Sequence, residues 1–329
     1  MEYRKIADGQ LEVSTVCLGC WAIVGDETWG PQDESEALAT LRQAVEDGIT
    51  FFDTAEGYGA GYSEQLLARA LAGRRDRVVI GSKVSRSHLS AAELPRACER
   101  SLTNLGTDYL DLYHIHWPSR TVPLAETVRA MESLVSAGKV RHVAVSNFGP
   151  ADLAEIVPLT RPVVDQLPYS LLWRAIEHEI LPACRSAGVA VTCYSPLMQG
   201  LLTGKFASVE EVPAGRARTR HFSGSRPQAR HGEAGAEAET FEAVAALREV
   251  ARRSGLDMAA MSLAWLLAQE AVASVVVGAR TPAQATRNAA AGDLHLPAEV
   301  IDELEQVSRP LREKFGPNPD MWQSVSRMR

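Results

Sequence analysis

The sequence contains no apolar run long enough to cross a lipid bilayer, and its first dozen positions already carry several charges. A membrane-spanning helix needs about 20 predominantly apolar residues, and a secretion signal needs an apolar stretch behind a short basic one. Neither pattern is found, so we expect a cytoplasmic protein without a membrane anchor.

Cysteine is scarce, with five residues at positions 17, 20, 98, 184 and 193. An odd number at wide spacing does not form the dense disulfide framework of small secreted domains. We therefore expect reduced thiols. We expect no redox role for the pair Cys17 and Cys20, because no thioredoxin-like helix follows it.

Positive charge is not in excess either, since 41 acidic residues face 34 basic ones and the formal net charge is −7. Nucleic acids and anionic membranes attract proteins with basic surfaces. We expect neither as a partner, and the oligomeric state stays open. With 46% hydrophobic and 23% charged residues, the composition is that of a folded globular chain.

Apolar segments that suit β-strands alternate with segments of helical periodicity along the chain. A hairpin is predicted over 3–13, followed by eight strands at 16–19, 50–53, 78–83, 109–114, 142–145, 163–167, 190–194 and 274–277. Helices are predicted between 33 and 48 and over 63–71, 91–105, 124–137, 150–157, 177–187, 240–254, 258–268 and 282–290. Each strand is thus followed by a helix.

Several predicted strands are apolar on both faces, for example 78–80 and 275–277, which is typical of a parallel sheet covered by helices. Eight such units close naturally into a barrel, and a doubly wound sheet is the alternative. We therefore predict an α/β fold in which residues 1–329 form one (β/α)8 TIM barrel with an N-terminal β-hairpin and extra C-terminal helices. The stretch near 206–239, rich in Gly, Ala, Arg and Ser, is predicted to be a mobile loop.

Polar residues gather where the predicted strands end. In a parallel barrel these carboxyl ends share one rim, where the chemistry takes place. Asp53 ends the second strand and is followed by Tyr58, Lys83 ends the third, and His116 follows the fourth. Such a set suits proton donation to a carbonyl oxygen, with Tyr58 as the general acid. We expect Lys83 to lower the pKa of Tyr58, Asp53 to hold the lysine, and His116 to bond the same substrate oxygen.

The same residues lie in motifs that resemble those of the aldo-keto reductases, in particular the bacterial type of this chain length. The motifs are DTAEGYG at 53–59, GSK at 81–83, LYHIHWP at 112–118, GKVR at 138–141, VSNF at 145–148, YSPL at 194–197 and GLLTGK at 200–205. The resemblance implies an oxidoreductase that reduces an aldehyde, ketone or sugar carbonyl, or oxidises the alcohol. It also implies hydride transfer with NADPH, or NADH, as the cofactor.

The resemblance further implies which residues hold the nucleotide. Ser146, Asn147 and Gln166 are expected at the nicotinamide carboxamide, and Tyr194 on the nicotinamide ring. The other expected contacts are Ser195, Leu197 and Gly200 near the pyrophosphate, and Gly278, Arg280, Gln284 and Asn288 at the adenosine end. Arg280 would meet the 2′-phosphate. NADPH-dependent members often have two or more basic residues in this last segment, so the choice between NADPH and NADH stays open.

Aromatic and basic residues of the loops are further candidates. Trp21, Trp29 and Trp117 are expected to line a substrate pocket, and Trp173 is a further candidate for the same role. The arginines at 216, 218, 220, 226 and 230 are expected either to close over cofactor phosphates or to be solvated. The small-molecule substrate itself cannot be derived from these loops.

Two other functions remain to be weighed. Some members of the resembled family are channel-associated subunits, so a nicotinamide-nucleotide sensor with little turnover is the alternative, although the complete set of four catalytic candidates disfavours it. The pair His114 and His116 could suggest a metal-dependent hydrolase barrel. Such a hydrolase has an Asp on the last strand, where this chain has Gly278, so no metal is expected.

Overall fold

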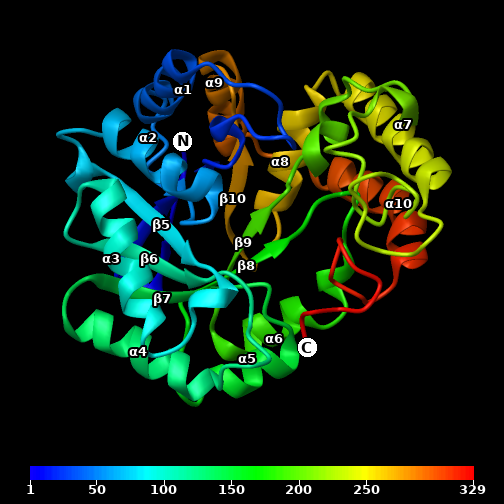
Figure 1. Cartoon of the computed structure of the whole chain (residues 1–329). Coiled ribbons are helices and arrows are strands. Elements are labelled where there is room, and N and C mark those ends of the chain that lie inside the picture. Colours follow the sequence, from blue (N-terminus) through cyan, green and yellow to red (C-terminus); the bar gives the residue numbers. More distant parts are fainter.

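Eight parallel strands close into a barrel in the computed structural model, which describes all residues from Met1 to Arg329 (Figure 1). The strands are β3 (Val16–Gly19), β4 (Phe51–Asp53), β5 (Val79–Val84), β6 (Leu110–Ile115), β7 (Val140–Ser146), β8 (Val164–Pro168), β9 (Ala190–Tyr194) and β10 (Val272–Gly278). Because β10 pairs with both β9 and β3, the sheet has no free edge. The predicted barrel is confirmed, and the doubly wound sheet is excluded.

Helices surround the barrel, and most begin and end within three residues of the predicted positions. They are α1 (Glu34–Glu46), α2 (Tyr62–Ala70), α3 (Glu93–Leu105), α4 (Leu124–Ser136), α5 (Pro150–Ile156), α6 (Ile180–Ala187), α7 (Glu237–Ser254), α8 (Met258–Leu267), α9 (Pro282–Ala290) and α10 (Ala298–Phe315). Local signals explain these limits. The Asp33 side chain accepts a hydrogen bond from the amide of Glu36 at the start of α1, and a left-handed Gly188 ends α6.

The predicted N-terminal hairpin consists of β1 (Tyr3–Ile6) and β2 (Leu11–Ser14), paired antiparallel. Ile6, Leu11 and Val13 share one apolar cluster with barrel residues such as Phe51 and Leu112. Burial of these side chains drives the hairpin against the amino-terminal end of the barrel. The carboxyl ends of the strands are left to form the cavity.

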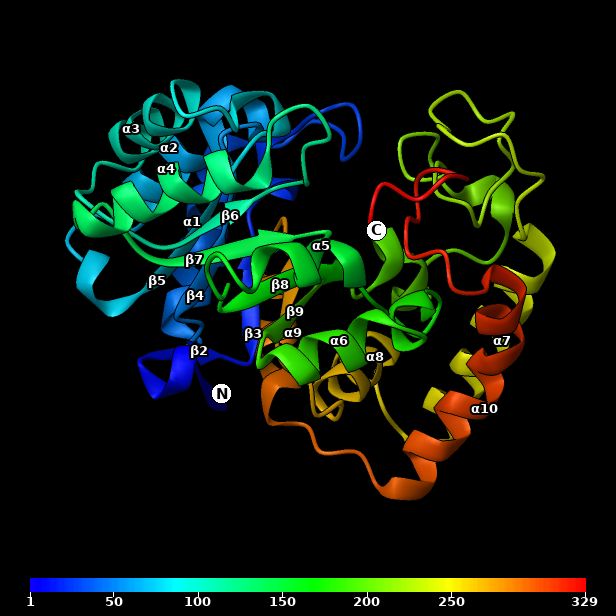
Figure 2. The ribbon, with the colours of Figure 1, turned by 90° about the horizontal axis from the view of Figure 1, so that it is seen from below.

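The segment from Phe206 to Ala236 contains no strand or α-helix, yet several of its side chains are buried. The amide of Arg220 donates to the carbonyl of Met321, so this segment lies beside the C-terminal tail, residues 316–329 (Figure 2). Below them α10 runs along α7, as the predicted C-terminal extension of the barrel. Mobility of the segment stays a prediction. None of the helices combines the length and the apolar character needed to cross a membrane.

Candidate active site

A cavity of about 1050 Å³ opens at the carboxyl ends of the barrel strands. Asp53, Tyr58 and His116 border it in one region, and the adenosine-end candidates Gly278 and Arg280 border it in another. All eleven expected cofactor residues line it, as do Trp21, Trp29 and Trp117. Trp173 does not, because it is fully buried against His221 and Phe315.

Lys83 joins the catalytic candidates from beneath the cavity floor. Its Nζ lies 2.5 Å from Asp53 Oδ1 and 3.3 Å from the Tyr58 hydroxyl, and it also donates to the carbonyl of Thr54 at 2.9 Å. The side chain is 0% exposed. The amide of Gln166 donates to the other carboxylate oxygen of Asp53 at 2.8 Å. Strands β4, β5 and β8 therefore hold one connected polar cluster.

Tyr58 reaches this cluster from the turn after β4. Gly61 has a φ of +92°, and a Cβ at this position would overlap the side chain of Asn104, so only glycine fits. The ring of Trp21 stacks on that of Tyr58 at 5.8 Å between centroids. The ring of His116 lies edge-on to the same phenol at 6.0 Å. The phenol is thus held between an indole and an imidazole above the lysine.

Burial and charge act in opposite directions on the pKa of Tyr58. Burial raises the pKa, the Lys83 ammonium lowers it, and the net result lies above the usual value of 10.0. Lys83 thus acts in the expected direction, but the net pKa of Tyr58 is not lowered as the sequence suggested, because loss of hydration outweighs the ammonium. Burial lowers the pKa of Lys83, but the Asp53 carboxylate and the Tyr58 hydroxyl raise it by more than burial lowers it. The net pKa lies above the usual 10.5, so the amine remains protonated. The pKa of His116 falls well below 6.5, through burial and the charge of Lys83, so its ring is neutral near pH 7.

A second polar network follows the ends of β7, β8 and β9. The Tyr194 hydroxyl donates to Asn147 Oδ1 at 2.9 Å, and Asn147 Nδ2 donates to Ser146 Oγ at 2.9 Å. The Ser146 hydroxyl donates in turn to the carbonyl of Gln166 at 2.8 Å. Asn147 and Ser195 have left-handed backbones, with φ of +63° and +53°. Strained backbone of this kind clusters at functional sites, where the surrounding fold holds it in place.

Cations without carboxylate partners mark another part of the cavity. Arg280 donates to the carbonyl of Trp29 at 2.6 Å and to Gln32 Oε1 at 2.8 Å, and these neutral acceptors leave its charge uncompensated. Lys205 and Arg216 line the same cavity. Burial lowers the pKa of both, and nearby positive charge lowers it further, from Arg216 and Arg280 in the case of Lys205 and from Arg280 in the case of Arg216. A Cβ at Gly200 would lie 2.8 Å from Lys205 Cε, so glycine lets the lysine approach.

These residues fit a dinucleotide, because unpaired cations suit its phosphates and the cavity offers polar groups along its length. Gln199 adds an amide that is 8% exposed and has no hydrogen-bond partner at either end. Gln199 and Lys205 were absent from the expected contacts. Their signal was in the sequence, since Lys205 ends the GLLTGK motif.

The loop arginines divide into two sets. Arg216, Arg218 and Arg230 line the cavity, whereas contact with cofactor phosphates stays a prediction. Arg220 and Arg226 instead form ion pairs with Glu233 and Glu237, which hold the loop together. The division arises because Glu233 and Glu237 lie next to Arg220 and Arg226 in the folded chain, and no acidic side chain lies within ion-pair distance of the other three.

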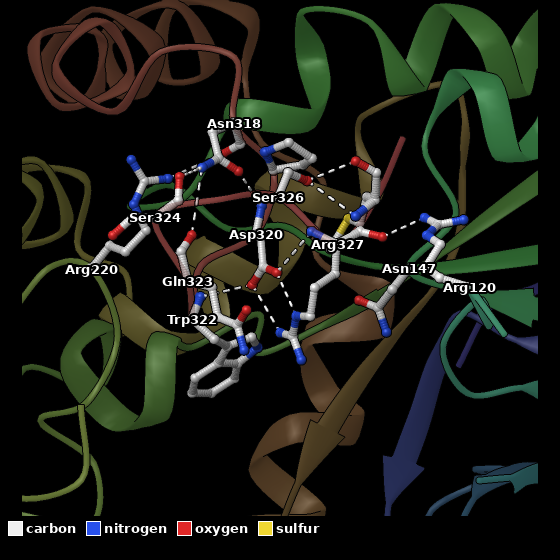
Figure 3. A network of polar contacts seen from close by, with 12 residues as sticks. Arg120, Asn147, Arg220, Asn318, Asp320, Trp322, Gln323, Ser324, Ser326 and Arg327 are labelled. Atoms are coloured by element: carbon white, nitrogen blue, oxygen red, sulfur yellow. Dashed lines mark hydrogen bonds and ion pairs between the residues drawn. The ribbon is translucent and has the colours of Figure 1, made fainter. Parts of the chain in front are cut away.

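Sequence reasoning missed the C-terminal tail. Trp322 and Arg327 line the cavity, and the Arg327 guanidinium lies 3.7 Å from the centre of the Trp117 ring. The same guanidinium pairs with the buried Asp320 at 2.6 Å (Figure 3). The tail carries none of the recognised motifs, so nothing local indicated that it would reach the site.

His114, the partner of His116 in the metal hypothesis, lies deeper in the barrel. Its Nδ1 is 3.2 Å from the carbonyl of Ser82, and its Nε2 has no partner. No three His, Cys, Asp or Glu side chains are grouped so that they could hold a metal ion.

The geometry can now be compared with known proteins. A family model described as the aldo/keto reductase family matches residues 15–309. The chain belongs to this family. The family expected from the motifs is confirmed. The expected class of enzyme, an NAD(P)H-dependent oxidoreductase, is confirmed with it.

Three curated relatives illustrate the range of the family. The chain is 34% identical over 295 residues to the aldo-keto reductase YhdN of Bacillus subtilis, covering 86% of each protein. It is 32% identical over 319 residues to an NADH-specific methylglyoxal reductase of Escherichia coli, covering 89% of this chain and 94% of that protein. It is 30% identical over 333 residues to a probable voltage-gated potassium channel subunit beta of Oryza sativa subsp. japonica, and the match covers 95% of this chain and 98% of that protein.

Solved structures agree in fold. A glycerol dehydrogenase from Gluconobacter oxydans superposes with a TM-score of 0.80 at 28% identity, covering 96% of this chain and 97% of that one. An aldo-keto reductase from Klebsiella pneumoniae, solved in complex with NADPH, has a TM-score of 0.74 at 29% identity, and the match covers 94% of this chain and 96% of that one.

Proposed function

We propose that this protein reduces an aldehyde, ketone or sugar carbonyl to the alcohol, or catalyses the reverse oxidation, with Tyr58 as the general acid or base. One observation carries the proposal: the Tyr58 hydroxyl faces the cavity 3.3 Å from a buried ammonium, which is itself 2.5 Å from Asp53. A phenol supported in this way can release a proton and tolerate the resulting negative charge.

NADPH is the proposed cofactor, with NADH as a second option, and when bound it supplies the hydride. Lys205, Arg216 and Arg280 would hold its phosphates. Ser146, Asn147 and Gln166 would hold the carboxamide, and the Tyr194 ring would cover the nicotinamide. The Klebsiella neighbour with NADPH supports the first option, and the NADH-specific relative from Escherichia coli supports the second.

The proton step follows from the positions of the side chains. Tyr58 donates its hydroxyl proton to the carbonyl oxygen as the carbonyl carbon is reduced, and the phenolate that remains is stabilised by Lys83. Asp53 keeps the lysine protonated and in place. The neutral ring of His116 donates an N–H to the same oxygen, and a donor of this kind is typically worth about 3 kcal/mol where charge develops. In the oxidation, the Tyr58 phenolate accepts the alcohol proton.

A nucleotide sensor with little turnover is the second candidate, supported by the channel-subunit relative. NADPH consumption with a panel of aldehydes, ketones and sugars separates the two functions, in parallel with titration of protein fluorescence by NADPH. We expect saturable binding together with turnover of at least one carbonyl. Tight binding without turnover of any carbonyl would contradict the enzyme and favour the sensor.

A further inference from the structure

A second group of positive charge lies in the cavity. Arg218 and Arg230 both line it and also border a side pocket formed with residues 26–28 and 227–229. No carboxylate lies within 4.0 Å of either guanidinium, whereas Arg220 and Arg226 of the same loop are ion-paired. The arginines of this loop that line the cavity, Arg216, Arg218 and Arg230, are thus the ones without an ion-pair partner, and Arg218 and Arg230 are the two that also share the side pocket.

Arg218 is tied to the catalytic end by aromatic contacts. Its guanidinium lies 5.3 Å from the ring centre of Trp21 and 4.8 Å from that of Trp322. Trp21 is the indole that stacks on Tyr58. Arg218 and Tyr58 therefore both contact the Trp21 ring, so a group bound at Arg218 lies in the same part of the cavity as the phenol.

The charge of Arg218 is not neutralised locally. Its Nε is buried and has no hydrogen-bond partner. Asp26 is the nearest acidic influence, but its carboxylate accepts from Trp21 Nε1 at 2.8 Å and from the amides of Thr28 and Trp29. Burial lowers the pKa of Arg218, the neighbouring Arg230 lowers it further, and Asp26 raises it, but neither Asp26 nor Glu27 of the side pocket forms an ion pair with the guanidinium. Partly buried guanidinium groups are stabilised by carboxylates or phosphates, which match their planar donors.

We propose that the carbonyl substrate carries a negatively charged group, a carboxylate or a phosphate, which binds Arg218 with support from Arg230. This rests on the proposed reductase function and names the substrate class for the same site. Because Arg218 and Tyr58 contact the same indole but not each other, the charge and the carbonyl of the substrate are expected to be several bonds apart.

Aromatic contacts separate Arg218 from the arginines proposed to hold the cofactor phosphates. Arg216 lies 5.5 Å from the ring centre of Trp29 and Arg280 donates to the Trp29 carbonyl, whereas Arg218 lies against Trp21 and Trp322. The cavity therefore holds two electrostatic groups. One lies beside the adenosine-end residues, and the other lies beside Trp21 and Tyr58.

Matched substrates test the proposal in the NADPH-loaded enzyme. 4-Carboxybenzaldehyde is compared with its neutral methyl ester, and glyceraldehyde 3-phosphate with glyceraldehyde, so that the two pairs separate carboxylate from phosphate. We expect kcat/KM to favour the charged member of at least one pair about tenfold or more, the scale of a charge-assisted hydrogen bond. Arg218→Gln should remove that preference, so that kcat/KM no longer distinguishes the charged from the neutral member of the pair.

A binding measurement keeps the test independent of turnover. Trp21 and Trp322 flank Arg218, so tryptophan fluorescence of the enzyme loaded with NADP⁺ should report benzoate binding and distinguish it from the neutral analogue benzamide. We expect benzoate to bind about tenfold more tightly than benzamide, and Arg218→Gln to abolish the difference. Equal binding of the two would overturn the charged-substrate proposal even if neutral carbonyls are reduced. Failure of all carbonyls to react, with benzoate still preferred, would instead count against the reductase function.

Two further variants exclude a purely structural role for the arginine. Arg226→Gln removes a cation of the same loop that is already bound to Glu237, and it should leave the charge preference unchanged. Arg218→Lys keeps the charge and should retain part of the preference. If Arg218→Gln weakens charged and neutral substrates alike, the residue only holds Trp21 and Trp322 in place, and the proposal is wrong.

Discussion

The barrel floor and the loops that cover it hold their charges in opposite ways. In the floor, the Lys83 ammonium is surrounded by Asp53, the Thr54 carbonyl and the Tyr58 hydroxyl, and no charge is left over. In the cover, Arg216, Arg218 and Arg280 face the cavity without a carboxylate partner. The ion pair of the floor is complete without a ligand, whereas these cations of the cover remain available to an anionic ligand.

The largest effect should come from breaking the floor pair. Lys83→Met leaves the buried Asp53 carboxylate without its ammonium, and loss of one partner of a buried ion pair costs about 3–5 kcal/mol. We expect the free energy of unfolding, measured in urea, to fall by this amount. The half-buried Arg218, which has no ion-pair partner, provides the control, since Arg218→Met should change the free energy of unfolding by less than about 1 kcal/mol. Similar losses in both variants would remove the distinction between floor and cover.

Tyr58→Phe should separate chemistry from stability within the floor. The phenol hydroxyl supplies the proton, so we expect kcat for carbonyl reduction to fall at least about a hundredfold, the scale of a lost general acid. NADPH affinity and unfolding in urea should remain near those of the unmodified enzyme, because the ring and its stack on Trp21 are retained. Undiminished turnover would show that Tyr58 is not the acid.

Arg280→Ala tests the charge of the cover. Only NADPH has a 2′-phosphate, so its dissociation constant should rise about tenfold while that of NADH changes much less. Arg280 also bonds the loop at Trp29 and Gln32, so Gln32→Ala is the matched control. That variant loosens the loop but keeps the cation, and it should affect both nucleotides equally. Equal losses in Arg280→Ala would contradict the assignment.

The smallest effect concerns pH. Burial raises the pKa of Tyr58 above 10.0 and lowers that of His116 well below 6.5, so neither group titrates between about pH 6 and pH 9. The proton donor is lost only as the pH rises through the raised pKa of Tyr58. We therefore expect kcat for reduction, measured with saturating NADPH, to be flat over this range and to decline above about pH 10. A decline centred near pH 7 would mean that another group supplies the proton.

The strand-end residues show where prediction from sequence succeeds. Asp53 ends β4 and Lys83 lies one residue before the end of the neighbouring β5, and a parallel barrel must bring such positions to one rim. The pKa of Tyr58 shows where prediction fails. The sequence indicated the neighbouring ammonium but not how completely the phenol would lose its contact with water, and burial decided the direction.

The alternation of strand and helix, the helix caps and the order of the motifs were determined by the sequence alone, because each depends on residues close together in the chain. The tertiary structure alone decided that the Arg218 guanidinium lies against both Trp21 and Trp322, and that Asp320 forms an ion pair with Arg327 and not with Arg218. These contacts join segments far apart in the chain, and no local pattern encodes which distant charge will find a partner.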